Sequence, residues 1–122
     1  MPATVRMWKH RRMDVISVTR DIDASPEAVF ELVTDLCRMG EWSPENEGGE
    51  WVDGATGPAL GAKFNGKNRN GDKTWTTSCT VTTYESPSAF AFDVTSGPFA
   101  ISTWAFDIAP TETGCRVVQS AT

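Results

Sequence analysis

Residues 16–36, ISVTRDIDASPEAVFELVTDL, hold a strand pattern that passes directly into a helix pattern. In the first part apolar and polar side chains alternate, which is typical of a strand covered on one face. Ser25 then suits a helix N-cap and Pro26 the first helical position, and apolar residues follow at helical spacing. The sequence therefore predicts a strand over 15–22 and an amphipathic helix over 26–36.

The chain after this helix has the pattern of a second short helix and then of strands. Asp35 is a candidate cap for the second helix, which is expected to end near Gly40, ahead of a turn at 42–44. Beyond that turn no helical period recurs, and the Asn-Gly-Asp turn at 70–72 is the strongest hairpin signal. The expected strands cover residues 49–54, 61–70, 74–85, 88–95, 100–109 and 114–121.

This order of elements predicts an α+β fold with an antiparallel sheet. A parallel sheet needs a crossover connection between its strands, and the six later strands have only short turns between them. Seven strands in a meander twist and curl, and a curled sheet with helices at its open side encloses a cavity. We therefore expect one domain over 14–122 with a pocket between sheet and helices.

Composition agrees with a folded domain of ordinary type. The 122 residues are 39% hydrophobic and 22% charged, as in globular proteins. The sequence lacks the run of about 20 apolar residues that a membrane span needs, and it lacks the apolar segment of a signal peptide. Its three cysteines are widely spaced, which suggests neither a disulfide framework nor a metal site. A cytoplasmic location without a membrane span is expected.

Charge is distributed unevenly along the chain. Residues 1–13 contain four basic side chains and no acidic one, so the rest of the chain has seven basic against 16 acidic residues. An acidic body repels the phosphates of nucleic acids, and no nucleic-acid partner is expected. We interpret residues 1–13 as a basic, disordered arm.

The alternation of side chains along the strands identifies residues that should face the concave side of the sheet. They are mainly aromatic with a few polar groups, as in pockets for small molecules, although each aromatic side chain taken singly suits a core equally well. Their polar members could bond either a ligand oxygen or a water. The candidate ligand-binding residues are Phe64, Asn68, Trp75, Thr77, Cys79, Phe90, Phe92, Trp104 and Phe106.

Residues that could carry other chemistry are few. His10, the only histidine, lies in the basic arm, which leaves the body without a Ser-His or Cys-His pair. No cluster has the spacing of a metal site, and no metal or cofactor is expected. Cys79 should be an inert thiol in apolar surroundings. Tyr84 is expected on the face opposite Trp75, while Arg20 could either anchor an acidic ligand group at the cavity rim or extend into solvent.

Two tryptophans lie close to the predicted helices in the sequence. Trp42 lies in the turn before the second strand, where it could plug the end of the sheet or form a wall at the pocket mouth, and we favour the plug. Trp51 lies among glycines and could be at an exposed edge, so it stays unassigned.

Three segments together resemble the START-like (SRPBCC or Bet v 1-like) superfamily, in particular actinobacterial polyketide cyclase/dehydrase and lipid-transport proteins. The segments are ISVTRDIDASPEAVFELVTDLCRMGEWSP, GAKFNGKNRNGDKTWTTSCTVTTYE and FAFDVTSGPFAISTWAFDIAPTETGCRVVQSAT. The resemblance implies a helix-grip fold, in which a seven-stranded antiparallel sheet wraps around a long C-terminal helix, two short helices close one end, and a deep apolar cavity lies between. Members bind lipids, sterols, polyketides and quinones, and a minority catalyse cyclisation or dehydration.

The sequence departs from the superfamily at its C-terminal end. It stops in the strand pattern GCRVVQSAT, residues 114–122, and contains no counterpart of the long C-terminal helix. Without a cover, the concave face would expose a large apolar patch, which is rare on soluble monomers. We therefore expect either a truncated form of a longer protein or a homodimer formed through the open sheet face.

Three functions remain open at this point. The leading hypothesis is a non-catalytic carrier or sensor of a small hydrophobic ligand, lipid-like, polyketide or aromatic. The alternative is a cyclase or dehydratase acting on a polyketide-like substrate, and the second alternative is a protein-interaction module. An ionisable side chain buried in the pocket beside an oxygen acceptor would favour catalysis, whereas a lining of aromatic, amide and hydroxyl groups would favour carriage.

Overall fold

The computed structural model of the protein describes residues 16–41 and 44–122. The expectations for the basic arm, for His10 and for Trp42 lie outside these residues. The elements are β1 (Ile16–Ile22), α1 (Pro26–Thr34), the 3-10 helix η2 (Leu36–Glu41), β2 (Asn46–Val52), β3 (Lys63–Asn70), β4 (Lys73–Glu85), β5 (Ala89–Ser96), β6 (Phe99–Pro110) and β7 (Cys115–Ala121).

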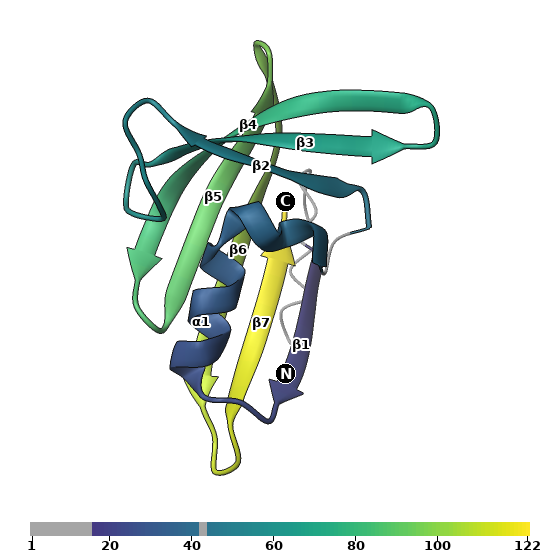
Figure 1. Cartoon of the computed structure of the whole chain (residues 1–122). Helices are drawn as coiled ribbons and strands as arrows, with labels where there is room; N and C mark the ends of the chain where they lie inside the picture. Colours follow the sequence, from purple (N-terminus) through teal and green to yellow (C-terminus); the bar gives the residue numbers. More distant parts are fainter. Residues whose placement is uncertain (1–15, 42–43) are drawn as a thin grey trace, which may run out of the picture.

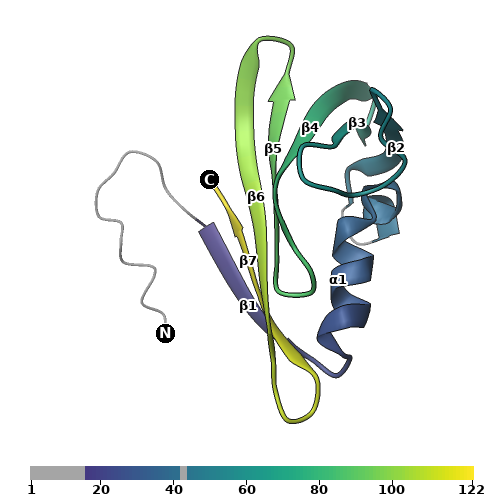
Figure 2. The ribbon, with the colours of Figure 1, turned by 90° about the vertical axis from the view of Figure 1, so that its left-hand side faces the viewer.

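All seven strands form one antiparallel sheet in the order β1-β7-β6-β5-β4-β3-β2. The strands from β2 to β7 are a meander, whereas β1 pairs with β7 at the other edge, with Ile22 opposite Cys115. The sheet curves so that β2, β3 and β4 bend over its concave side, where α1 also lies (Figures 1 and 2). The predicted α+β helix-grip fold with two short helices after the first strand is confirmed. Among the described residues no helix follows β7.

Helix α1 begins as the sequence predicts and ends two residues earlier than expected. Ser25 has extended backbone angles, and its Oγ accepts a hydrogen bond from the Ala28 N–H at 3.1 Å. The helix ends at Thr34 because Asp35 leaves the helical conformation and its N–H bonds to the Leu32 carbonyl. The short helix η2 follows and continues to Glu41.

A bulge in β4 changes which side chains face inward. The pairing of β4 with β5 shifts between Val81 and Thr83, so the alternation reverses beyond this point. Tyr84 consequently lies opposite Phe90 and contacts Phe30 of α1, with ring centroids 5.3 Å apart. The predicted placement of Tyr84 on the opposite face is wrong for this reason.

Strand β2 begins three residues earlier than expected, because its glycines allow an irregular start. The pairing with β3 shifts between Asn46 and Gly49. A Cβ on Gly49 would collide with the carbonyl oxygen of Asn65 and would lie 2.9 Å from the Phe64 ring. Glycine at this position therefore lets β2 approach β3 closely. Trp51, further along β2, is half-buried and packs edge-on against Phe64, with centroids 5.2 Å apart.

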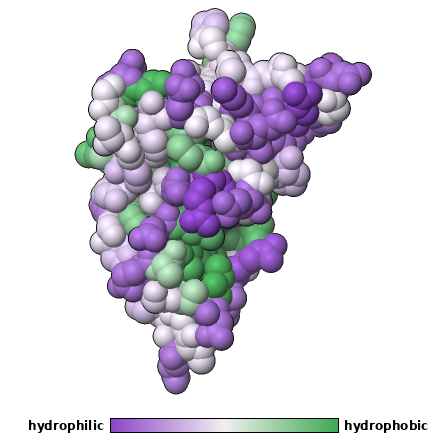
Figure 3. All heavy atoms as spheres, viewed as in Figure 1, coloured by the Kyte–Doolittle hydropathy of each residue, from purple (hydrophilic) through white to green (hydrophobic). Residues whose placement is uncertain are grey.

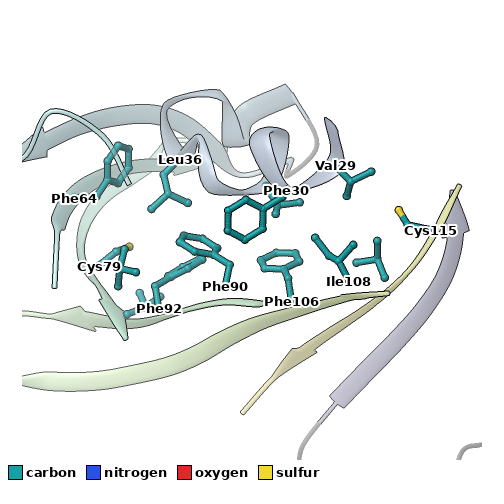
Figure 4. Packing of buried hydrophobic residues seen from close by; sticks show 14 residues of the cluster. Val29, Phe30, Leu36, Phe64, Cys79, Phe90, Phe92, Phe106, Ile108 and Cys115 are labelled. Atoms are coloured by element: carbon teal, nitrogen blue, oxygen red, sulfur yellow. The ribbon is translucent and has the colours of Figure 1, made fainter. Parts of the chain in front are cut away.

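The core lies between α1 and the middle of the sheet (Figure 4). Phe90 is its centre, with only 1% of its surface exposed, and its ring contacts those of Phe30, Phe92 and Phe106 at centroid distances of 6.4, 5.6 and 6.4 Å. Aromatic pairs at these separations stabilise a core beyond their buried area alone. The rest of the buried cluster is Val29, Val33, Leu36, Phe64, Cys79, Val81, Val94, Ile108, Cys115 and Val117.

We predict that Phe90→Ala lowers the free energy of unfolding by about 3–5 kcal/mol, because it leaves a cavity between helix and sheet. The matched control is Phe99→Ala on β6, since Phe99 is 69% exposed and its truncation should change stability by about 0.5 kcal/mol or less. Urea unfolding followed by circular dichroism measures both variants. Equal losses of stability in the two would contradict this description of the core.

Candidate functional site

The concave side of the sheet holds a hollow of about 470 Å³, here called the sheet hollow. Strands β2 to β7 supply its floor and walls, and η2 supplies one side chain at its end. Its lining is mostly apolar. The residues are Met39, Pro44, Glu45, Asn46, Phe64, Gly66, Asn68, Trp75, Thr77, Cys79, Phe92, Val94, Ile101, Ser102, Trp104, Phe106 and Gln119.

Of the nine candidate residues, the structure brings eight together around the sheet hollow and places one elsewhere. Phe90 does not line it, because Phe30 of α1 and Tyr84 of β4 cover its ring and make it part of the core. The binding role of the other eight stays a prediction. Those that line the hollow are Phe64, Asn68, Trp75, Thr77, Cys79, Phe92, Trp104 and Phe106.

Polar groups gather where β2, β3 and β4 meet. Asn68 Nδ2 donates a hydrogen bond to Thr77 Oγ1 at 3.4 Å, and Asn46 is the residue opposite Asn68 on β2. Gly66 lies opposite Thr77, and a Cβ there would be 3.0 Å from Thr77 Oγ1. The glycine thus leaves space beside these amides and this hydroxyl, where an oxygen or N–H group of a ligand can bond.

The sheet hollow offers little for acid or base chemistry. Glu45 is exposed at its edge and accepts a hydrogen bond from Asn70 Nδ2 at 2.6 Å. Cys79 is buried, and burial raises the pKa of its thiol to about 11. A hydrogen bond with Thr77 lowers this pKa, but by less than burial raises it. At neutral pH the thiol is therefore protonated. Within residues 16–41 and 44–122 no three His, Cys, Asp or Glu side chains could hold a metal ion.

Several lining residues escaped the sequence analysis. Asn46 was outside the expected second strand, and Met39 comes from η2 rather than from a strand. Ile101 and Ser102 are neighbours in the chain that both line the hollow, because the β5–β6 pairing is irregular there. Val94 follows Phe92 by two residues on β5, so the same alternation could have indicated it. The alternation along β7 could likewise have indicated Gln119.

A second hollow of about 380 Å³, here called the helix hollow, lies between α1 and strands β1 and β7. Hydrophobic residues gather beside α1 over this part of the sheet (Figure 3). Arg20, an exposed residue, provides the only charged side chain among the lining residues. Its two alternative roles, an anchor for an acidic ligand group or a side chain extended into solvent, both stay predictions. The lining residues are Val18, Arg20, Ile22, Ala24, Ala28, Val29, Leu32, Val33, Phe106, Val117 and Gln119.

The curved seven-stranded antiparallel sheet with two short helices after its first strand matches the Bet v 1-like class of helix-grip proteins. The family described as polyketide cyclase / dehydrase and lipid transport matches residues 13–122, and the chain belongs to this family. The predicted START-like relationship is thereby confirmed, whereas an actinobacterial source stays a prediction. No curated protein sequence is significantly similar to the chain.

Solved structures agree with this assignment. A Polyketide_cyc-like protein from Corynebacterium glutamicum is 34% identical with a TM-score of 0.61, and the match covers 88% of this chain and 63% of that one. The chain thus spans less than two thirds of that relative's length. Ginseng major latex-like protein 151 from Panax ginseng shares the fold at 8% identity, with a TM-score of 0.69 and 88% and 76% coverage of the two chains. BexL, a di-domain ARO/CYC from the BE-7585A biosynthetic pathway, also shares the fold, at 19% identity and with a TM-score of 0.66. The match covers 88% of this chain and 34% of BexL.

None of the helices in the described part of the chain is long and apolar enough to cross a membrane. The cytoplasmic location stays a prediction.

The raised pKa of Cys79 predicts slow alkylation. At pH 8 a thiol with a pKa of about 11 is ionised in roughly one molecule in a thousand. Partial burial and the nearby Asp35 and Glu50 carboxylates also raise the pKa of Cys37. Its side chain is nevertheless exposed, so iodoacetamide should modify Cys79 more slowly than Cys37. The rate at Cys79 should rise steeply as the pH approaches 11. Peptide mapping by mass spectrometry separates the two sites, and Cys79→Ser provides the blank. Equal rates at pH 8 would show that the thiol is not buried in solution.

Proposed function

We propose that this protein binds a small hydrophobic ligand in the sheet hollow and carries or senses it without converting it. The observation that carries the proposal is the lining itself, which joins aromatic walls to a small group of amides and hydroxyls. Pockets for small molecules have this composition, since apolar area supplies affinity and a few polar groups fix orientation.

The side chains of the hollow have distinct parts in this proposal. Trp75 and Trp104 come from different strands and line the same space as Phe92 and Phe106. Trp75 remains 37% exposed, so a ligand can remove a large apolar area from water by packing against it. Asn68, already bonded to Thr77, retains a free carbonyl oxygen that can accept a hydrogen bond from the ligand.

The same lining argues against the cyclase or dehydratase alternative. A general acid or base must reach the reacting atom and have a pKa near the working pH. The buried Cys79 thiol stays protonated, and the exposed Glu45 carboxylate is held by Asn70 at the edge of the hollow. Transport of a ligand is the activity in the family's description that requires no such group. The protein-interaction module and a homodimer through the open sheet face stay predictions.

The test is a titration with the uncharged fluorescent probe N-phenyl-1-naphthylamine. Trp75→Ala should weaken its binding roughly ten-fold, because the variant loses about one ring of apolar contact. Phe99→Ala is the matched control, since it removes an exposed aromatic ring of the same sheet that does not line the hollow, and its affinity should stay within two-fold of the unmodified protein.

Recovery of the ligand completes this test. A ligand found by native mass spectrometry should keep its mass after long incubation with the protein if carriage is the function. Absence of probe binding, or an equal effect of the two substitutions, would refute a binding role for the sheet hollow, and a changed ligand mass would favour catalysis.

A further inference from the structure

We infer that the ligand is a long-chain monocarboxylic acid whose carboxylate pairs with Arg20 and whose apolar chain runs through the helix hollow into the sheet hollow. This inference rests on the proposed function and adds to it the chemical class of the ligand and a second binding region. Nothing in the family's description assigns a role to Arg20 or to the helix hollow.

The lining of the helix hollow is apolar apart from one cation and one amide. Val18, Arg20 and Ile22 are alternate residues of β1, so the guanidinium rises from the same face as two aliphatic side chains. Val117 lies opposite Arg20 on β7, and α1 contributes only alanine, valine and leucine side chains. A fatty acid has the complementary pattern of one anionic group on an apolar chain.

Arg20 differs from the other arginines of the described chain in its lack of an acidic partner. Arg38, Arg69 and Arg116 each form an ion pair, with Glu41, Glu47 and Asp21 respectively, at N–O distances of 2.7–2.9 Å. No ion pair within residues 16–41 and 44–122 includes Arg20, and no carboxylate lines the helix hollow. An arginine offers a planar set of donors that matches a carboxylate, which makes it well suited to this role.

The two hollows are adjoining parts of one surface. Phe106 of β6 and Gln119 of β7 line both of them. A chain anchored at Arg20 can therefore pass over Phe106 and reach the aromatic walls around Trp104. An acid of this kind leaves its carboxylate at the rim and its apolar chain against the aromatic walls of the sheet hollow, where Asn68 and Thr77, which bond each other, can bond a hydroxyl group on the chain.

The experiment compares laurate with dodecanol, which have the same chain length and differ in charge. Both are measured by displacement of N-phenyl-1-naphthylamine at pH 7.5 from the unmodified protein, from Arg20→Gln and from Arg116→Gln. The last is the matched control, because Arg116 lies on the neighbouring strand and, together with Asp21, on the face of the sheet that points away from the hollow.

The unmodified protein and Arg116→Gln should bind laurate at least ten-fold more tightly than dodecanol, and Arg20→Gln should bind the two about equally. The preference should vanish below about pH 4, where an ordinary carboxyl is protonated.

Each other outcome has a separate meaning. Equal binding of laurate and dodecanol by the unmodified protein, with the effect of Trp75→Ala intact, would overturn the role of Arg20 and leave the proposed function standing. No binding of either compound or of the probe would overturn both. A second copy of the chain is the competing occupant of this face, and sedimentation velocity tests for it. A ligand-free dimer that laurate does not dissociate would show that a second copy covers the face, and it would overturn the inference.

Discussion

The packing of Phe30 against Phe90 and Tyr84 is the contact on which the rest of the structure depends. It fixes α1 over the middle of the concave face and joins helix to sheet through two edge-to-face ring pairs, while a third such pair joins Tyr84 to Phe90 within the sheet. Because α1 is only nine residues long, it covers one part of that face and leaves hollows on either side. The division between core and candidate site therefore follows from the position and length of one short helix.

Much of this arrangement could be predicted from local patterns in the sequence. The alternation of side chains correctly placed Trp75 and Cys79 on the concave side, and the cap at Ser25 correctly marked the start of α1. The failures have a common cause. Tyr84 and Asn46 lie next to bulges, where one extra residue reverses the alternation, and a bulge has no side-chain pattern of its own. Phe90 faces the concave side as predicted, but the sequence could not show that α1 covers its ring, since only the tertiary position of α1 decides which inward rings it covers.

The chemistry of the two hollows differs from that of the outer surface. Charged side chains of the described chain pair with one another on exposed positions, as Arg69 does with Glu47 and Arg116 with Asp21. Such exposed pairs contribute little to stability. The polar groups that line the hollows are mainly amides and hydroxyls, with Arg20 in the helix hollow and Glu45 at the edge of the sheet hollow. The thiol of Cys79 behaves as a small apolar group because burial keeps it protonated. Under the proposed function, an environment of this kind would select a ligand by shape and by hydrogen bonds without reacting with it.

The pairing of β1 with β7 has a consequence for how the protein is made. The hydrogen bonds of Arg116 with Asp21 join residues 95 positions apart, and the helix hollow needs side chains from both of these strands. Pairing of segments so distant in the chain raises the contact order and slows folding. During synthesis, the residues of β1 leave the ribosome long before their partners on β7, such as Val117 opposite Arg20, are available. The nascent chain thus carries an unpaired, partly apolar first strand until β7 is available, and unpaired strands of this kind favour aggregation during that interval.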